Sequence, residues 1–464
     1  MRSPVPLSLE VAIARLIGRA SRLAGRGGGT TLPGKVLAAV DPAAVARLAA
    51  RLPRGSAIVT GTNGKTTTAA MTAEILARRV RLAHNRAGAN LVSGVASALL
   101  EQRRAELGLF EVDEGAFPHV ARHLRPRVVC LANLFRDQLD RYGELELVAE
   151  RWREAVAALE PAASVLVNAD DPLVANLARG RQHVVRFGLD DPSAARERLP
   201  HAADSKYCVD CGTPYGYEAA YVGHLGAYRC PSCGNARPRL DVAARSVSFD
   251  GLAGTVFELA TPEGSRRIAL GLPGLYDVYN ALAAAALALV LGATLDDVQA
   301  GLERFRPAFG RFERIRVGER TVLLLLVKNP AGANEVVRTL VDGRPPEVAV
   351  VALNDGIADG RDVSWIWDVD FEPLIGALER LIATGGRAHE LALRFKYGGL
   401  DPERIEVVPA LDKALDRGLE LTPLGGELPV LPTYTAMLAL REVVAERGLV
   451  EPYWARREEE PSLA

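Results

Sequence analysis

The sequence predicts an α/β protein with two main parts, a large domain built on a doubly wound parallel sheet and a smaller α/β domain at the C-terminus. Short apolar segments alternate with Ala-, Leu- and Arg-rich helical patterns, which is typical of βαβ units. The alternation is interrupted near residue 200 and restarts after about residue 313. With 464 residues, the chain is long enough for about three folding units.

Five segments in the first half of the chain are apolar on both faces, as buried parallel strands are. They are Ser56–Thr60, Leu107–Asp113, Arg127–Asn133, Ser164–Asn168 and His183–Phe187. Farther on, "FELATPEGSRRIALGLPG" predicts paired strands, and a long Ala-rich helix is expected after Asn280. Beyond Glu313 the strand pattern returns in "TVLLLLV", "EVAVVAL", "ERLIAT", "RIEVV" and "LPVL".

These patterns predict four regions. We expect an N-terminal helical segment over residues 1–50, a central domain over 51–312, an insertion within it over 200–240, and a Rossmann-like domain over 313–464. The insertion differs in composition, because it is rich in Cys, Tyr, Gly and Pro. The N-terminal stretch is interrupted by Glu10, Arg15 and Arg19, so it predicts an amphipathic helix and not an export signal.

Overall charge and hydropathy exclude several function classes. The formal net charge is −1, so no basic field indicates nucleic-acid binding. The longest apolar run, which starts at Ala281, is too short and too Ala-rich to span a bilayer. We therefore expect a cytoplasmic protein, in which the five cysteines indicate metal binding or buried thiols and not disulfides.

The stretch "VTGTNGKTTTAAM", from Val59 to Met71, has the pattern of a phosphate-binding loop between a strand and a helix. Backbone N–H groups at the helix start would face phosphate oxygens, and the helix dipole favours anions there. Lys65 supplies a mobile positive charge for the β- and γ-phosphates, and the Thr66 hydroxyl is placed to bind Mg²⁺. A chance Gly-Lys-Thr turn is the alternative. The predicted ATP-binding residues of the loop are Gly61, Thr62, Asn63, Gly64, Lys65, Thr66 and Thr67.

Four of the five cysteines follow the spacing C-x₂-C-x₁₈-C-x₂-C, which is typical of a zinc ribbon. They are Cys208, Cys211, Cys230 and Cys233. Four thiolates close a tetrahedral Zn²⁺ site, so we expect a zinc that stabilises the insertion and takes no part in catalysis. The fifth, Cys130, lies in a predicted buried strand and is expected to be unreactive.

The loop lacks the first glycine of the usual pattern, and in this it resembles the nucleotide loop of the Mur ligase family of ATP-dependent amide ligases. Further stretches resemble the family in the same order: "FEVDEG", "NLFRDQLDRYGE", "VLVNADDP", "GLPGLYDVYNALAA" and "GRFE". The resemblance implies that Glu111 binds Mg²⁺, that Asn280 lies beside the adenine, and that Arg311 reaches the γ-phosphate across the domain gap. It leaves a second Mg²⁺ site undecided, because Gln138 stands where the family usually has a histidine ligand.

Two C-terminal stretches narrow the resemblance. "VKNPAGANE" and "ALNDGIADGRDVSWIWDVDFE" resemble the MurT branch, the ligase-like subunits of lipid II isoglutaminyl synthase, which also carry a four-Cys insertion. Only about 55 residues precede the phosphate loop, too few for the UDP-binding domain of most Mur ligases. The resemblance implies ATP-dependent amidation of the D-glutamate α-carboxylate of the lipid II stem peptide, through an acyl phosphate, at the inner membrane face.

Ammonia is expected from a partner, because no cysteine is left over for glutamine hydrolysis. In the MurT branch this partner is a GatD-type glutaminase, and the resemblance implies that Asp362 orients its catalytic histidine. The predicted catalytic residues are thus Lys65, Glu111 and Asp362. The residues alone favour another interpretation, in which Asp362, like Asp355 and Asp359, is a loop carboxylate that caps a helix.

Two rival functions are weighed against this one. A stand-alone ligase would add an amino acid, as folylpolyglutamate synthase does, but the four-Cys insertion and the short N-terminal segment argue against it. A non-catalytic nucleotide-gated binding module is the second rival. The presence of Lys65, Thr66, Glu111 and Arg311 argues for turnover instead.

Overall fold

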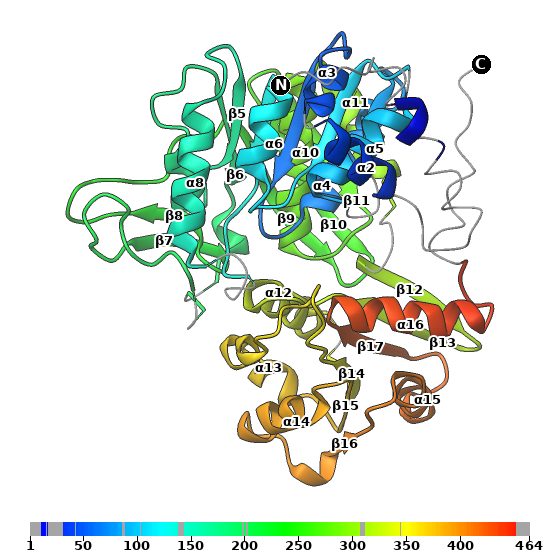
Figure 1. Ribbon diagram of the computed structural model, residues 1–464. Helices are drawn as coiled ribbons and strands as arrows, with labels where there is room; N and C mark the ends of the chain where they lie inside the picture. Colours follow the sequence, from blue (N-terminus) through cyan, green and yellow to red (C-terminus); the bar gives the residue numbers. More distant parts are fainter. Residues whose placement is uncertain are drawn as a thin grey trace.

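The computed structural model describes residues 11–14, 16, 31–41, 43–85, 89–102, 104–137, 143–196, 199–200, 203–306, 311–343 and 345–451. Figure 1 shows a larger body that contains the N-terminal and central elements, and a smaller body below it, coloured yellow to red, that contains the C-terminal elements. Most of the predicted N-terminal amphipathic helix lies outside the described residues.

A nine-stranded sheet forms the centre of the larger body, in the order β11-β10-β9-β6-β5-β4-β1-β3-β2. The strands from β9 to β2 run parallel, and β10 and β11 extend the sheet beyond β9 in antiparallel pairs. The strand order reverses at β1, which has β3 on one side and β4 on the other, as a doubly wound sheet requires. The bounds are β1 Ser56–Thr60, β2 Leu82–His84, β3 Leu107–Glu111, β4 Val128–Leu131, β5 Ser164–Asn168, β6 Val184–Leu189, β9 Val242–Asp250, β10 Gly254–Thr261 and β11 Gly264–Leu270.

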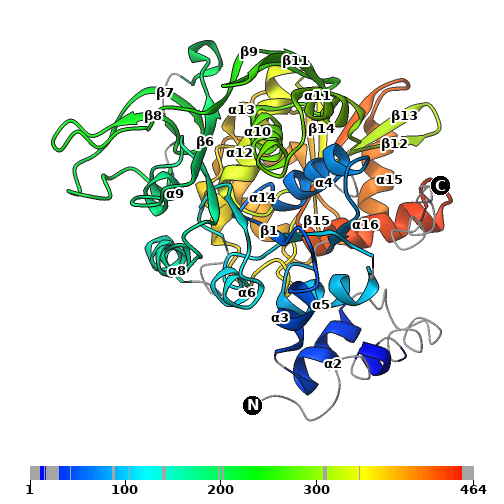
Figure 2. The same cartoon turned by 90° about the horizontal axis from the view of Figure 1, so that it is seen from above.

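Two helical layers cover the parallel sheet, one on either side of β1 (Figure 2). Alternate residues of β1 point to opposite layers, because side chains of a strand alternate between its faces. Ala57 and Val59 belong to the core with α4 Lys65–Leu76, α10 Leu275–Val290 and α11 Leu295–Arg304. Ile58 belongs to the core on the other face, with α2 Leu32–Val40, α3 Ala44–Ala49, α5 Val92–Glu101, α6 Phe117–Leu124, α8 Leu145–Ala157 and α9 Pro172–Leu177.

The smaller body has a six-stranded sheet in the order β12-β13-β17-β14-β15-β16, parallel except for β12. Its strands are β12 Arg311–Val317, β13 Arg320–Leu325, β14 Val348–Ala352, β15 Arg380–Thr384, β16 Ile405–Val407 and β17 Glu427–Pro432. Its helices are α12 Pro330–Asp342, α13 Glu372–Ile375, α14 Ala388–Tyr397, α15 Leu411–Leu421 and α16 Tyr434–Glu446, with short 3₁₀ turns η2 Ser364–Asp368 and η3 Pro402–Arg404. This sheet starts at Arg311, and the division at residues 312 and 313 stays a prediction.

The insertion contributes a separate two-stranded sheet of β7 Gly216–Val222 and β8 Leu225–Arg229, preceded by the 3₁₀ turn η1 Pro192–Ala194. Its small core contains Cys208, Tyr215, Tyr228 and Cys230. No helix among the described residues is long and apolar enough to cross a bilayer.

All five strands predicted in the first half are present, although some of them begin or end at residues other than those predicted. The segment predicted as Leu107–Asp113 ends at Glu111, because the Asp113 N–H donates to the carbonyl of Asn90 instead of continuing the ladder. The Ala-rich helix was expected after Asn280 but already starts at Leu275, so Asn280 lies inside α10.

Candidate active site

The predicted phosphate loop connects β1 to α4 at the point where the strand order of the central sheet reverses. In open α/β sheets, ligands bind at this point, outside the carboxyl ends of the strands. Gly64 precedes the first residue of α4 with φ +81°, a left-handed conformation that favours glycine. The strand, loop and helix that a phosphate site needs are therefore present.

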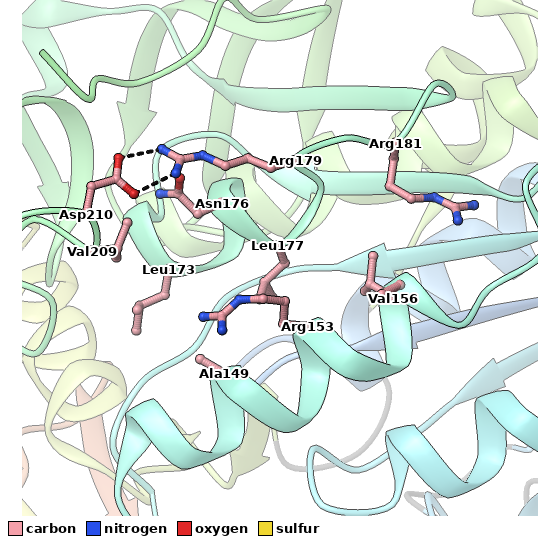
Figure 3. A pocket seen from close by; sticks show the side chains of 11 residues that line it. Ala149, Arg153, Val156, Leu173, Asn176, Leu177, Arg179, Arg181, Val209 and Asp210 are labelled. Atoms are coloured by element: carbon pink, nitrogen blue, oxygen red, sulfur yellow. Dashed lines mark hydrogen bonds and ion pairs between the residues drawn. The ribbon is translucent and has the colours of Figure 1, made fainter.

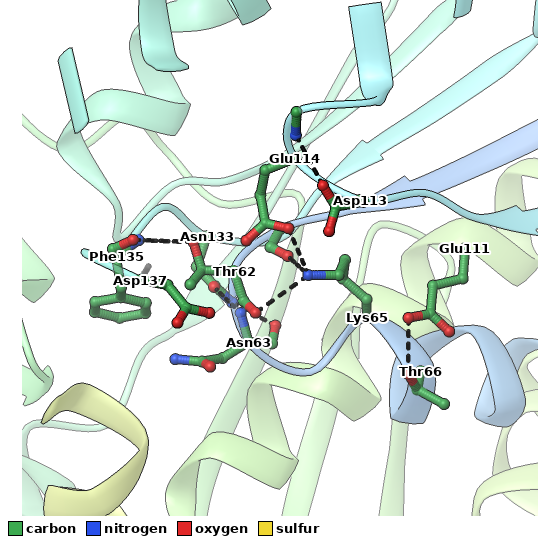
Figure 4. Close-up of polar contacts among 12 residues, drawn as sticks. Thr62, Asn63, Lys65, Thr66, Glu111, Asp113, Glu114, Asn133, Phe135 and Asp137 are labelled. Carbon is green, nitrogen blue, oxygen red and sulfur yellow. Dashed lines mark hydrogen bonds and ion pairs between the residues drawn. The ribbon is translucent and has the colours of Figure 1, made fainter. Parts of the chain in front are cut away.

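Lys65 is buried, and its ammonium group donates three hydrogen bonds at the loop (Figure 4). Its Nζ lies 2.5 Å from the Gly61 carbonyl oxygen, 3.2 Å from the Thr62 carbonyl oxygen and 2.7 Å from Glu114 Oε2. Burial by itself raises the pKa of Glu114, but the charges of Lys65 and Lys328 outweigh it and hold that pKa below its ordinary value. An ionised Glu114 therefore keeps the lysine beside the loop.

Thr66 and Glu111 come together at the start of α4 and the end of β3, as the sequence predicts. The Thr66 hydroxyl donates to Glu111 Oε1 over 2.8 Å, and both residues border a cavity (Figure 4). A hydroxyl and a carboxylate are oxygen donors of the kind that Mg²⁺ takes, usually together with waters and substrate phosphates. The donor set at this position fits Mg²⁺.

The β4 side fixes the loop through an asparagine. Asn133 Oδ1 accepts from the Asn63 N–H over 2.9 Å, and Asn133 Nδ2 donates to the Asn63 carbonyl over 3.0 Å. The Thr62 hydroxyl accepts from the Phe135 N–H over 2.9 Å. The loop backbone is thus held from the neighbouring strand before any ligand binds.

The C-terminal domain contacts the same loop from the opposite side. The side-chain amides of Asn63 and Asn329 pair, with Asn329 Nδ2 donating to Asn63 Oδ1 over 3.0 Å and Asn63 Nδ2 donating back over 3.3 Å. Lys328 Nζ donates to the Thr62 carbonyl over 3.0 Å and forms an ion pair of 2.6 Å with Asp137. Two consecutive residues ahead of α12 therefore bring the second domain onto the phosphate loop.

Asn280 lies against the loop glycine. A Cβ atom at Gly64 would be 1.8 Å from Asn280 Oδ1, so only glycine leaves room for this side chain. Asn280 Nδ2 donates to Asp277 Oδ1 over 2.9 Å, which fixes its orientation. The structure thus brings Asn280 to the start of α4.

The two domains enclose a cavity of about 340 Å³ in front of the loop. The central domain contributes the loop, Glu111 and Asn280, and the C-terminal domain contributes Lys328 and Glu335. Predicted residues that line it are Thr62, Asn63, Gly64, Lys65, Thr66, Thr67, Glu111 and Asn280. The side chain of Arg311 and the residue Gln138 lie outside the described residues.

The insertion forms part of the wall of this cavity. Val222 and Leu225, on either side of the turn between β7 and β8, line it. Between them, the fully buried His224 packs against the ring of Phe135, with ring centroids 4.7 Å apart. The insertion therefore packs against the segment after β4, which is hydrogen bonded to the phosphate loop through Thr62.

The insertion and the residues just before it also contact helix α12 of the C-terminal domain. Arg196 forms an ion pair with Glu335, which is only 2% exposed, and its Nε donates to the Tyr221 carbonyl over 3.2 Å. Arg338 donates to the carbonyls of Tyr221 over 3.2 Å and Ala194 over 3.3 Å. These contacts join the insertion to the second domain beside the cavity.

The four predicted zinc ligands converge. Their Sγ atoms all lie within 4.8 Å of one another, and the pairs Cys208–Cys233 and Cys211–Cys230 are 3.5 Å apart. Four sulfurs around a tetrahedral Zn²⁺, at about 2.3 Å each, would be about 3.8 Å apart. The cluster therefore has the size of a tetrahedral Zn²⁺ site. Cys130 is buried away from it, and burial raises its pKa to about 12.

Asp362 lies on the surface of the C-terminal domain, far along the chain from the loop. It is exposed, and its Oδ1 accepts from the Ser364 N–H over 2.8 Å. The hydrogen bonds from Ser364 lower its pKa. Asp355 and Asp359 have partners in other segments, an ion pair of 3.0 Å with Arg387 and hydrogen bonds from Thr435.

A larger cavity, about 400 Å³, lies between α8, α9 and the insertion (Figure 3). Its charged lining is already engaged: Arg179 binds Asp210 through two hydrogen bonds of 2.6 and 2.8 Å. Arg181 donates to the backbone carbonyls of Leu159, Glu160 and Ala163. It contains none of the predicted site residues, so we do not take it for the active site.

The site contains several residues to which the sequence by itself assigns no role. Glu114, Asn133 and Lys328 stand inside stretches that resemble the Mur ligase family, but nothing in those stretches marks them as site residues. Glu335 ends "VKNPAGANE", and its partner Arg196 is 139 residues away. Only the resemblance of those stretches to the family pointed toward them, because no local pattern shows which polar residues of a segment face a cavity.

Comparison with known proteins gives the same two parts. The family model described as the Mur ligase middle domain matches residues 59–226, and the one described as the MurT ligase C-terminal domain matches residues 326–437. Solved structures share the fold, including a pseudomurein peptide ligase type C from Methanothermus fervidus, with a TM-score of 0.69, 22% identity, and coverage of 86% of this chain and 80% of that one. Folylpolyglutamate synthase of Mycobacterium tuberculosis has a TM-score of 0.58 at 17% identity and covers 86% and 94% of the two chains.

Curated relatives are more similar in sequence. The MurT subunit of lipid II isoglutaminyl synthase (glutamine-hydrolyzing) from Streptococcus pneumoniae is 33% identical over 96% of this chain and 99% of its own length. The subunit of the same name from Staphylococcus aureus is 31% identical over 93% of this chain and 96% of its own length. This protein therefore belongs to the MurT family, the ligase-like subunits of lipid II isoglutaminyl synthase within the Mur ligase family.

Proposed function

We propose that this protein is the synthetase subunit of a lipid II isoglutaminyl synthase, which uses ATP to convert the D-glutamate α-carboxylate of the lipid II stem peptide to D-isoglutamine. The observation that carries the proposal is the cavity between the two domains, where Lys65, the Thr66–Glu111 pair and Lys328 converge. The names of the MurT relatives support it. Lipid II places the reaction at the inner membrane face.

The chemistry requires an activated carboxylate, because ammonia does not displace oxygen from a free carboxylate. A carboxylate oxygen attacks the γ-phosphorus of ATP, and ADP leaves with the bonding electrons. Ammonia then attacks the acyl carbon, the C–N bond forms, and the C–O bond to phosphate breaks. Phosphate takes the electron pair, and the nitrogen loses a proton to solvent.

The loop residues position and neutralise the phosphates in this scheme. Lys65 exchanges Glu114 for the β- and γ-phosphate oxygens, and the backbone from Gly61 to Thr67 surrounds them. Mg²⁺, held by Thr66 and Glu111, would neutralise charge on the same oxygens. We further propose Asn280 beside the adenine and Arg311 at the γ-phosphate.

Ammonia comes from a GatD-type glutaminase in this proposal. Among the described cysteines, four share one cluster and Cys130 is buried, so none is placed as a glutaminase nucleophile. Exposed apolar side chains lie on the segments around Asp362: Ile357 is 87% exposed, Trp367 48% and Tyr397 72%. A surface of this kind suits a protein partner, and the exposed Asp362 would orient the partner's catalytic histidine.

We also propose that Cys208, Cys211, Cys230 and Cys233 hold one Zn²⁺. Four thiolates leave no open position, so the ion would stabilise the insertion without binding substrate. The central domain at residues 51–312 and the C-terminal domain at 313–464 remain our proposed division.

Reconstitution tests the ligase assignment. The protein is combined with its glutaminase subunit, ATP, Mg²⁺, lipid II and glutamine, and the amidated product is measured by mass spectrometry. Lys65→Ala should abolish amidation, with or without added ammonium, while the exposed Lys413→Ala control keeps it. Amidation by folded Lys65→Ala at the wild-type rate would contradict the proposal. Incorporation of a whole amino acid would favour the stand-alone ligase.

Asp362→Asn tests the partner assignment. Loss of the triad carboxylate costs about 10⁴ in kcat in serine proteases, and we expect a smaller loss of glutamate release here, because a cysteine thiolate is the stronger nucleophile. Ammonium-fed amidation should be unchanged. Asp355→Asn in the same loop is the control and should keep glutamate release. Unchanged glutamate release by Asp362→Asn would contradict the proposed role in the glutaminase and would show that Asp362 is only a loop carboxylate.

A further inference from the structure

We infer that the insertion positions the phosphate loop for ATP, and that His224, at the tip of its β7–β8 hairpin, is the positioning residue through which it does so. This role rests on the proposed binding of ATP at the loop, and it gives the insertion a function beyond its own folding. His224 is fully buried, and among the described residues neither of its ring nitrogens has a well-formed hydrogen bond. Burying a polar ring in this way is unfavourable, so another interaction must keep His224 in place.

The charge of Asp171 provides that interaction. His224 Nε2 lies 3.4 Å from Asp171 Oδ2, and both side chains are fully buried. Burial by itself lowers the pKa of His224, but the charge of Asp171, with a smaller contribution from Asp204, raises that pKa above its ordinary value. The pair is therefore favoured in its charged form, an imidazolium beside a carboxylate.

Asp171 connects this pair to the segment after β4. Its Oδ2 accepts from the Leu134 N–H over 2.9 Å, and its Oδ1 caps α9 by accepting from the Leu173 N–H over 3.0 Å. The carboxylate is thus fixed by the first turn of a helix, and it holds the backbone at Leu134. His224 balances the charge of this buried carboxylate from the side of the insertion.

Phe135, the next residue of that segment, joins the hairpin tip to the phosphate loop. Its ring packs against the His224 ring with the centroids 4.7 Å apart. Its N–H donates to Thr62 Oγ1 over 2.9 Å, and the Thr62 hydroxyl donates to its carbonyl over 3.2 Å (Figure 4). A displacement of Phe135 would therefore also displace Thr62.

The Thr62 carbonyl holds the two lysines of the site. It accepts from Lys65 Nζ over 3.2 Å and from Lys328 Nζ over 3.0 Å. These lysines come from different domains, and both line the cavity in which the phosphates are proposed to bind. The position of one carbonyl thus affects both cations, and His224 affects that carbonyl through Phe135.

Gly223, the residue before His224, allows the hairpin tip to approach Phe135. Its φ is +56°, and a Cβ atom there would lie 2.7 Å from Cε1 of the Phe135 ring. Gly251, in the turn between β9 and β10, has a similar φ of +51°, but a Cβ atom there would meet nothing within 4 Å. Alanine strains the backbone at both positions, whereas it presses on Phe135 only at position 223. The two glycines are therefore a matched pair for testing this contact.

The experiment compares His224→Ala, Gly223→Ala and Gly251→Ala with the wild-type protein in the complete complex. Calorimetric titration gives the Kd for ATP, and ammonium-fed amidation gives kcat and the KM values for ATP and lipid II. Residues that orient the groups around a ligand typically contribute about 10- to 100-fold to affinity, so we expect the Kd and KM for ATP to rise about tenfold in His224→Ala. They should rise at least about threefold in Gly223→Ala and stay unchanged in Gly251→Ala. The kcat at saturating ATP and the KM for lipid II should stay within about twofold, because only ATP binding is weakened.

Each of three results would contradict this role. A wild-type Kd for ATP in folded His224→Ala and Gly223→Ala would show that the hairpin tip does not act on the loop. An equal rise in Gly223→Ala and Gly251→Ala would make backbone strain the cause instead of the contact with Phe135. A fall in kcat with an unchanged KM for ATP would assign His224 to the chemical step. Failure of the proposed function itself would look different, because the wild-type complex would then neither bind ATP nor amidate lipid II.

Discussion

The ion pair between Arg196, which lies just before the insertion, and Glu335 joins the central domain to the C-terminal domain, and Arg196→Met should show how much it contributes to the docked arrangement. Methionine keeps an unbranched side chain but removes the charge. Glu335 is 2% exposed, whereas the Arg196 side chain is 19% exposed, so the carboxylate is left in an almost dry site. Truncating one partner of a buried pair typically costs about 3–5 kcal/mol.

The expected cost lies near the lower end of that range. Water reaches part of Arg196, and the charge of Arg338 also acts on Glu335. The hydrogen bond from Arg196 Nε to the Tyr221 carbonyl is lost as well, which is worth about 1 kcal/mol. We therefore expect Arg196→Met to lower the free energy of unfolding by about 3 kcal/mol at pH 8.

The cost should depend on pH. Burial raises the pKa of Glu335 above its ordinary value of 4.5, although Arg196 and Arg338 oppose this. Without Arg196 the folded-state pKa rises further. A raised folded-state pKa gives stability that is present below the unfolded pKa and lost as pH rises through the folded pKa. The destabilisation by Arg196→Met should thus be small near pH 5 and grow toward pH 8, by at most about 1.4 kcal/mol per pH unit.

Urea unfolding at pH 5, 6, 7 and 8 measures this dependence. Glu335→Gln in the Arg196→Met background should remove most of it, because the group that titrates is gone. Arg266→Met is the control, since its pair with Asp296 is 38% and 80% exposed and is expected to contribute about 0–1 kcal/mol. A pH-independent loss in Arg196→Met, or a loss equal to that of the control, would refute the argument.

Three further outcomes are expected. Gly64→Ala should weaken ATP binding by more than about tenfold, because its Cβ would displace Asn280, whereas Gly180→Ala, at φ +78° with nothing within 4 Å, should keep the affinity; calorimetric titration with ATP compares them. Cys208→Ser should release zinc, measured by elemental analysis, and Cys130→Ser should retain it; zinc-free wild-type protein prepared without chelator would contradict the site. Asn329→Ala removes both the N-cap of α12 and the amide pair with Asn63, so the urea midpoint should fall by the equivalent of about 1–2 kcal/mol and the KM for ATP should change; an unaltered midpoint would contradict the cap.

Local chemistry made the central fold predictable. Strands such as Ser56–Thr60 are buried on both faces because helices cover both sides of a parallel sheet. Five consecutive residues are therefore enough to predict such a strand. The phosphate loop needs glycine, lysine and threonine at fixed spacing because the backbone itself encloses phosphate. The cysteine spacing predicted the cluster because the two cysteines of each C-x₂-C pair lie in one turn, which directs both thiols toward the same point. A function that one segment performs without distant partners can therefore be predicted from the residues of that segment.

The enclosed cavity was decided only by tertiary structure. Asn63 and Asn329 are 266 residues apart and pair through amides that look like any other polar side chain in the sequence. Lys328 contacts Asp137 and Thr62, and Arg196 contacts Glu335. Both sets of contacts cross the boundary between the two domains, so the roles of these residues depend on how the domains pack. The predicted start of α10 was wrong for a related reason. The Ala-rich pattern begins only after Asn280, but packing against α4 and the sheet keeps Leu275–Tyr279 helical as well. Polar contacts between distant segments depend on which faces the fold brings together, and because hydrogen bonds are short and directional, no local pattern of residues encodes that choice.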